Sequence, residues 1–162
     1  MLFLNYLKFL LSATNQHGVH SPFVYAFVTK GIYAKQKYSV QKSLNILMKI
    51  VSYFGITEMN MQHENKVLSE LIAKHFPKIK PSKNTTAFIY FSAIDDSLLK
   101  FLAQKNSLHN DSIVYIDAIY QNKKAWEDLI LMEKITVSID LFYGGVLFFR
   151  REQVKEHFKI RI

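Results

Sequence analysis

Two histidines close together, His17 and His20, could bind a metal ion near the start of the chain. Imidazole nitrogens three positions apart can share one ion. The same rings can instead donate hydrogen bonds to backbone carbonyl groups in a turn, and we favour this structural role. The sequence has no cysteine, which excludes a thiolate metal site, a disulfide framework and a cysteine nucleophile. Any metal ligands must therefore be histidine or carboxylate side chains.

Positive charge is the second feature with a chemical consequence. Lysine and arginine number 21 against 13 acidic residues, which gives a formal net charge of +8. Such charge favours contact with anionic surfaces, including nucleic acid and membranes, but it does not specify a fold. A cluster of basic residues is most often a solvated face, and its functional interpretation is a patch for an anionic partner. The basic tail of this chain consists of Arg150, Arg151, Lys155, Lys159 and Arg161.

The length and composition predict one folded domain. A chain of 162 residues, 49% hydrophobic and 21% charged, is typical of a single globular domain. The apolar stretch at 2–13 lacks a basic start and is interrupted by Asn5 and Lys8. It is also shorter than the about 20 residues that cross a bilayer. We therefore expect a cytoplasmic protein without a transmembrane segment.

Helical spacing dominates the first half of the chain. Ser21 before Pro22 can cap a helix, and Gly55 is a typical helix stop. Between 55 and 64 nothing is periodic, so we expect no regular element there. The predicted helices cover 1–13, 22–30, 44–54 and 67–76. The face of the first helix that we expect to meet the core consists of Phe3, Tyr6, Leu7, Leu10 and Ala13.

Runs with the length and composition of strands appear in the second half. The apolar runs at 85–91 and 112–116 predict strands that are buried on both faces. Asp95 and Asp96 open a helix between them, because carboxylates favour the positive end of a helix dipole, and a second helix follows around 125–130. Two strands joined by a helix form a βαβ unit, so we expect them to be parallel.

The last part of the chain predicts an antiparallel hairpin. Its strands cover 136–142 and 146–150, and Tyr143-Gly144-Gly145 joins them because glycine reaches positive φ freely. We expect a short helix or strand in the tail at 151–162. The predicted fold class is therefore α/β, with a helical N-terminal half, a parallel βαβ unit and a C-terminal antiparallel hairpin.

Longer motifs in the sequence can be compared with known families. They are His17-Gly18-Val19-His20-Ser21-Pro22-Phe23-Val24, His109-Asn110-Asp111-Ser112, Asp117-Ala118-Ile119-Tyr120, and 136–142 with 146–150. With these motifs, the chain resembles a Bacteroidetes family of class I methyltransferase-like proteins, which in turn resembles catechol O-methyltransferases. The resemblance covers the N-terminal third and nearly everything after Ala87. It implies a truncated Rossmann-like methyltransferase fold in one domain over 1–162, with a helical region at 1–55 and a sheet-forming half at 85–162.

The resemblance also implies where a metal and catalytic groups would lie. In catechol-type relatives, oxygen ligands after the fourth and fifth strands hold Mg²⁺, and the matching positions here are Ser92, Asp117 and Ala118. Asp117 is the one carboxylate among them and the one candidate metal ligand, so we expect no metal site built by the protein. Helix capping explains Asp95 more simply than catalysis does. The candidate catalytic residues are Asp95, Asp117 and Tyr120, and the candidate cofactor contacts are His17, His20 and Ser21.

The cofactor-binding stretch of such relatives has no counterpart in the sequence. There, a first strand leads into a glycine-rich turn around S-adenosylmethionine, and an acidic residue after the second strand pairs with the ribose hydroxyl groups. Between Phe54 and Thr85 this chain offers one helix and one glycine, Gly55. We therefore expect no cofactor, unless the family activity is retained, and an inactive homologue kept as a binding or scaffold protein.

Two other functions are alternatives to this interpretation. One is an active O-methyltransferase whose site is completed by oligomerisation, and the other is a basic protein that binds nucleic acid or a membrane surface. Loss of the first strands would also leave an exposed edge in the sheet, which proteins normally pair or cover. We predict a homo-oligomer through this edge, or coverage of the edge by the helix at 67–76.

Overall fold

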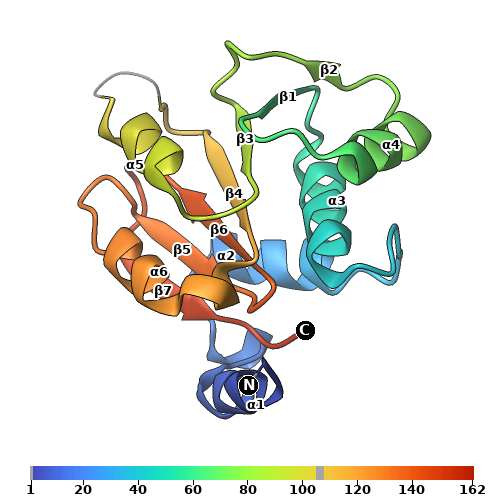
Figure 1. The fold of residues 1–162 in the computed structure, drawn as a ribbon. Helices are drawn as coiled ribbons and strands as arrows, with labels where there is room; N and C mark the ends of the chain where they lie inside the picture. Colours follow the sequence, from blue (N-terminus) through green and yellow to red (C-terminus); the bar gives the residue numbers. More distant parts are fainter. Residues whose placement is uncertain (1, 105–107) are drawn as a thin grey trace.

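The computed structural model describes residues 2–104 and 108–162, which form an α/β fold (Figure 1). A mixed seven-stranded sheet lies between helices. The strands are β1 (Glu58–Met61), β2 (Lys80–Pro81), β3 (Phe88–Phe91), β4 (Ile113–Asp117), β5 (Val137–Asp140), β6 (Gly144–Phe148) and β7 (Glu156–Lys159). The α-helices are α1 (Leu2–Ser12), α2 (Pro22–Ala26), α3 (Lys42–Phe54), α4 (Lys66–His75), α5 (Asp96–Ala103) and α6 (Lys123–Ile130). Short helical turns of other types are η1 (Gln16–Gly18), η2 (Phe27–Ile32) and η3 (Ile119–Asn122).

The strand order of the sheet is β2-β1-β3-β4-β6-β5-β7. Only β6 runs against its neighbours, β4 and β5, and the other pairs are parallel. From β1 the chain passes through α4 to β2 on one side, and from β3 it passes through α5 to β4 on the other. The two connections therefore diverge between β1 and β3, which makes the carboxyl ends of these strands the expected place for a ligand in an open α/β sheet.

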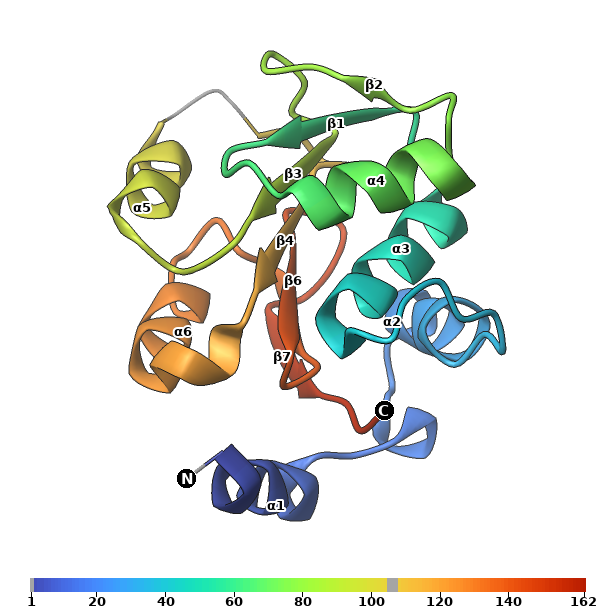
Figure 2. The same cartoon turned by 45° about the vertical axis from the view of Figure 1, so that its right-hand side comes forward.

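Side chains alternate across the sheet and divide the core into two layers. Phe88 and Tyr90 of β3 face the layer that includes α3 and α4, whereas Ile89 and Phe91 face the layer of α5 and α6. Figure 2 shows these two pairs of helices on opposite sides of the strands. The predicted βαβ unit and the burial of both its strands are confirmed, because β3 and β4 are parallel and their apolar residues are buried.

Strand β1 lies where the sequence predicted no regular element, and β2 lies between the predicted helix at 67–76 and the predicted strand at 85–91. Strand β1 has no β-branched residue, but it pairs with both β2 and β3, and its buried Asn60 donates to the carbonyl oxygen of Lys83 at 2.8 Å. The prediction of an exposed edge at β3 is therefore wrong. At this end of the sheet the edge strand is β2, which consists of two exposed residues and ends in Pro81. A short strand with proline is a poor template for pairing. Helix α4 packs on a face of the sheet and does not cover its edge.

The antiparallel hairpin is confirmed, but its glycines have another role than predicted. Positive φ occurs at Phe142 (φ 65°), and neither glycine adopts it. Gly144 and Gly145 lie inside β6, and large side chains of the core approach their backbone closely. A Cβ atom would lie 2.0 Å from the hydroxyl of Tyr115 at Gly144 and 2.5 Å from the ring of Trp126 at Gly145. The glycines therefore make room for side chains of the core.

Several helix ends follow the sequence prediction. The Ser21 hydroxyl accepts a hydrogen bond from the Val24 amide at the start of α2. Gly55 adopts left-handed backbone angles (φ 62°) after α3, and Asp95 caps α5 by accepting from the Leu98 amide at 3.1 Å. The tail forms a strand, β7, as one of the two predicted outcomes.

The predicted inward face of the first helix is confirmed in part. Tyr6, Leu10 and Ala13 pack in the cluster around Phe142, as predicted. Phe9, which was not part of the predicted face, is the buried residue of α1. Phe3 and Leu7, which we expected to face inward, are exposed. Across the part of the chain that the structure describes, none of the helices has both the length and the apolar character needed to traverse a membrane.

Candidate functional site

Polar side chains gather at the carboxyl ends of β1, β3 and β4, around the point where the connections diverge. His63 lies two residues beyond β1, Ser92 follows β3 directly, and Asp117 ends β4. Asn65, in the turn between β1 and α4, caps α4 by accepting from the Leu68 amide at 3.0 Å. Because these strands are parallel, their carboxyl ends bring together residues that are far apart in the sequence.

His63 connects the turn after β1 to the turn after β3. Its Nδ1 atom accepts from the backbone amide of Ser92 at 3.1 Å and from the hydroxyl of Ser92 at 2.8 Å. An amide can only donate, so Nδ1 carries no proton and Nε2 carries it. Nε2 lies 3.2 Å from an oxygen of Asp95, and it can therefore donate to that carboxylate. This chain of bonds holds the turn after β1 against the start of α5.

Ser92, His63 and Asp95 also follow one another as serine, histidine and carboxylate do in sites where the histidine activates a serine nucleophile. In that chemistry, the histidine nitrogen takes the serine proton while the carboxylate orients the ring. Here the amide and the hydroxyl of Ser92 share the single lone pair of Nδ1, so the ring is engaged in holding the backbone. We therefore interpret the series as a structural bridge between two turns.

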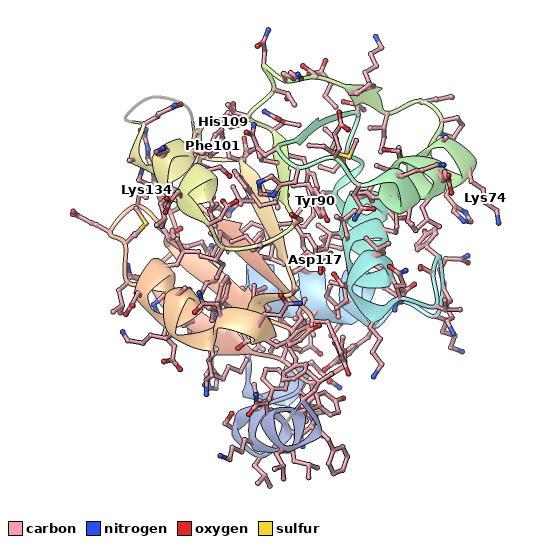
Figure 3. All side chains as sticks on the ribbon, viewed as in Figure 1. Lys74, Tyr90, Phe101, His109, Asp117 and Lys134 are labelled. Carbon is pink, nitrogen blue, oxygen red and sulfur yellow. The ribbon has the colours of Figure 1, made fainter. Side chains whose placement is uncertain are left out.

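Asp117 and Tyr90 form a second, more buried network next to this bridge. Asp117 accepts hydrogen bonds from the Ser43 hydroxyl at the start of α3 and from the Tyr90 hydroxyl, the latter at 3.4 Å. Tyr90 in turn accepts from the Asn65 amide group at 3.0 Å. The hydroxyl of Tyr115 donates to the Ser43 carbonyl oxygen at 2.8 Å. Figure 3 shows Tyr90 and Asp117 near the middle of the molecule.

Burial shifts the ionisation of this network. It raises the pKa of Asp117, although the hydrogen bond from Ser43 opposes the shift. Burial likewise raises the pKa of Tyr90 to about 12, and it raises the pKa of Tyr115 well above its ordinary value. Both tyrosines therefore keep their protons near neutral pH and serve as hydrogen-bond donors to the groups around them.

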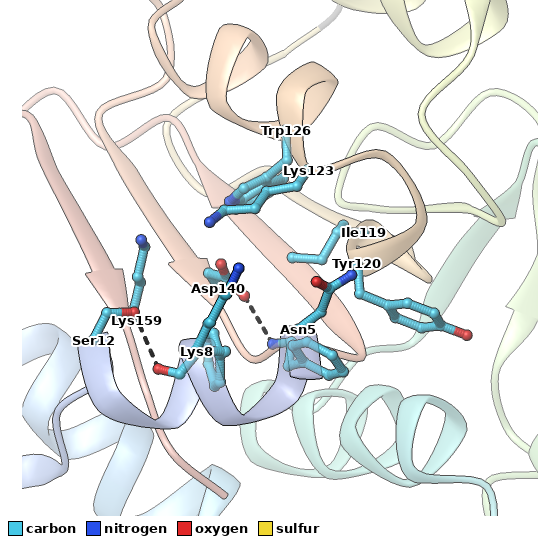
Figure 4. A pocket seen from close by; sticks show the side chains of 11 residues that line it. Asn5, Lys8, Ser12, Ile119, Tyr120, Lys123, Trp126, Asp140 and Lys159 are labelled. Atoms are coloured by element: carbon cyan, nitrogen blue, oxygen red, sulfur yellow. Dashed lines mark hydrogen bonds between the residues drawn. The ribbon is translucent and has the colours of Figure 1, made fainter. Parts of the chain in front are cut away.

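A second part of the carboxyl edge, at β4, β5 and β7, contains a small cavity. It measures about 90 Å³ and lies beside α1 (Figure 4). Lys8, Lys123 and Lys159 are arranged around Asp140, the last residue of β5. Burial raises the pKa of Asp140, whereas the amide of Phe142 and the charge of Lys159 act in the opposite direction. Three ammonium groups against one carboxylate make this cavity basic.

Comparisons with protein-family models, with curated proteins and with solved structures find no match. The residues of the chain itself must therefore carry any functional assignment.

The turn after β1 does not fit S-adenosylmethionine in the mode of the resembling family. A glycine-rich turn would let the backbone approach the ligand, but residues 62–65 contain no glycine. The side chains of His63 and Asn65 are bonded across to β3 and to the turn after it. The residues that follow β2 are Ser82 and Lys83, and neither is the acidic partner that the ribose hydroxyl groups need.

The positions that match a magnesium site do not fit the metal either. Ser92 is bonded to His63, Ala118 has no ligand atom in its side chain, and both oxygens of Asp117 already accept hydrogen bonds. Among the described residues, there is also no group of three or more histidine and acidic side chains that could hold an ion. The arrangement suits a hydrogen-bonded support better than a metal centre.

The other predicted site residues lie away from these networks. Tyr120 lines the basic cavity, where its ring stacks on Phe142 with centroids 5.3 Å apart. His17 lies within η1, and its ring contacts Gln16 at 3.3 Å in place of the predicted backbone carbonyl. His20 is exposed. Ser21 is a helix cap and also donates to Gln153 at 3.0 Å.

Three residues of the basic tail have different surroundings. Arg150 is paired with Glu152 and lies 3.8 Å from Asp111. Lys155 donates to backbone carbonyl groups in the loop after α6, and Lys159 lines the basic cavity. Binding of an anionic partner by this tail stays a prediction.

Proposed function

We propose that this chain is a cytoplasmic, Rossmann-like methyltransferase homologue that transfers no methyl group and is retained as a binding protein. The order of a parallel βαβ unit, a further helix and an antiparallel hairpin supports the relation to methyltransferases. The main support for a protein without catalysis is the structure of the turn after β1. There, the side chains of His63 and Asn65 occupy hydrogen bonds across the carboxyl edge, where a cofactor would need free backbone.

Binding would require these bonds to break. A nucleoside at the β1 turn would have to displace His63 from Ser92 and Asp95, and it would find no carboxylate after β2 for its ribose. Buried polar groups that lose partners without replacement cost about 1–3 kcal/mol each. The cofactor would therefore bind poorly, because protein side chains fill the β1 turn and no carboxylate after β2 is present to bind the ribose.

Calorimetric titration of the purified chain with S-adenosylmethionine and S-adenosylhomocysteine, with and without Mg²⁺, tests the proposal. We expect no saturable heat from a sample that unfolds cooperatively on warming. A ligand present at a hundredfold excess over its Kd would stabilise the fold by about 2.7 kcal/mol, so thermal unfolding provides a second readout. Saturable binding or a raised Tm would contradict the proposal and favour an active enzyme. The dependence of cofactor binding on protein concentration would then show whether oligomerisation completes the site.

A further inference from the structure

The outer face of α1 is apolar and exposed. Phe3, Leu7 and Leu11 follow one another at four-residue spacing and are 69%, 40% and 89% exposed, and Leu4 lies beside them. Surface helices normally place polar residues on the side that faces water. Figures 1 and 2 show α1 at one end of the molecule, apart from the layers of the sheet. The exposed stripe therefore points away from the body of the protein.

The opposite face of α1 is firmly packed, so the stripe is not the result of a loose helix. Phe9 contacts Phe142 with ring centroids 5.4 Å apart, and Tyr6 meets the same ring edge to face at 4.9 Å. After the helix, Thr14 pairs with β7 through its amide, which donates to the Lys159 carbonyl oxygen at 2.8 Å. Aromatic contacts and backbone pairing thus fix which face of α1 is turned outward.

Lysines flank the stripe on both sides. Lys8 lies one turn from both Leu4 and Leu11 on α1 and is exposed. On the other side, the ammonium group of Lys42 lies 5.3 Å from the ring centroid of Tyr6. Lys159, in the basic cavity beside α1, adds charge on the Lys8 side. Apolar side chains between cations fit the boundary of a bilayer, where apolar groups enter the acyl region and ammonium groups meet anionic headgroups.

We propose that α1 docks this protein on an anionic membrane surface, with the helix lying in the plane of the headgroups. A second copy of the chain fits this face less well. Symmetric pairing would bring Lys8 and Lys42 of two chains, each with a net charge of +8, close together. The inference rests on the proposed role as a binding protein and names its partner.

Co-sedimentation with lipid vesicles tests the docking. The full chain should bind vesicles of phosphatidylglycerol and phosphatidylcholine, bind pure phosphatidylcholine far less, and be released by salt. A Leu7→Ser/Leu11→Ser variant should bind at least about tenfold more weakly, because it loses buried apolar surface. Removing charge with Lys8→Gln/Lys42→Gln should weaken binding about fivefold for each lysine.

The matched control replaces exposed apolar residues away from α1. Leu131→Ser/Val154→Ser changes side chains that are 69% and 85% exposed, and it should leave vesicle binding unchanged. Failure of the folded wild-type chain to bind anionic vesicles would overturn the inference, as would equal losses in the control. A concentration-dependent dimer that Leu7→Ser/Leu11→Ser abolishes would assign the face to a second copy instead. Neither result depends on S-adenosylmethionine, whose titration tests the proposed function separately.

Discussion

The carboxyl edge of the sheet has two parts that differ in what fills them. At β1, β3 and β4, side chains from α3, the β1 turn and two strands bond to one another around Asp117 and His63. At β4, β5 and β7, a basic cavity beside α1 is left open between Lys8, Lys123 and Lys159. In the first part, polar groups hold turns together. In the second part, Lys8 and Lys159 line an open cavity, and Lys123 beside them also lies 3.7 Å from Glu127.

This difference indicates where function is to be sought. In an open α/β sheet, ligands are expected where the connections diverge, and here that place is closed by hydrogen bonds within the protein. The basic cavity and the exposed apolar side chains of α1 lie at the opposite end of the same edge. Substitutions should therefore affect stability in the bonded part and binding in the part around α1.

Gly144→Ala should give the largest loss of stability. Its new Cβ atom would lie 2.0 Å from the hydroxyl of Tyr115, which is fully buried and cannot move aside. Overpacking of this kind costs about 3 kcal/mol, measurable by urea unfolding.

Two variants serve for comparison. Gly55→Ala should cost about 1 kcal/mol, because the new Cβ meets no atom within 4 Å but the residue has positive φ. Lys123→Ala in the basic cavity should cost less than about 0.5 kcal/mol. Equal losses at the two glycines would mean that Tyr115 is not held rigidly.

Tyr90→Phe should come next. The variant removes the hydroxyl that donates to Asp117 and accepts from Asn65, so two polar groups lose a partner at about 2 kcal/mol in total. Tyr25→Phe is the matched control, because Tyr25 is exposed on α2 and its change should stay within about 0.5 kcal/mol. If the two variants had the same denaturant midpoint, the Tyr90 hydroxyl would not contribute to the stability of the network.

Local patterns predicted most of the fold. The runs at β3 and β4 are apolar and aromatic up to Asp117, and short runs of this composition between polar segments favour buried strands. Strand β1 was missed because Glu58–Met61 is short and mixed in polarity. It is a strand because two other strands pair with it, and no local pattern carries that information.

The site could be predicted only in part, for the same reason. Asp117 was a candidate because the family resemblance matched it to a metal-ligand position, but His63 and Asn65 had no predicted role because β1 was not predicted. Their partners lie 29 and 25 residues further along the chain, beyond the reach of periodicity. In α1, apolar residues occur on nearly every side, so spacing could not show which of them would face the core.

The smallest expected effect is a change of stability with pH, and it separates two carboxylates at the same edge. Burial raises the pKa of Asp117, so the folded state binds this proton more readily than the unfolded state, and the stability it contributes is lost as pH rises through the raised pKa. For Asp95, burial acts upward, but hydrogen bonds from the Ser97 hydroxyl and the Leu98 amide hold the pKa below its ordinary value. Its contribution is present above the unfolded pKa and is lost as pH falls.

Urea unfolding at about pH 4 and about pH 7 checks both signs. As pH rises, the free energy of unfolding of Asp117→Asn should increase relative to wild type, and that of Asp95→Asn should decrease. Slopes of the same sign for both variants would contradict the difference in their surroundings.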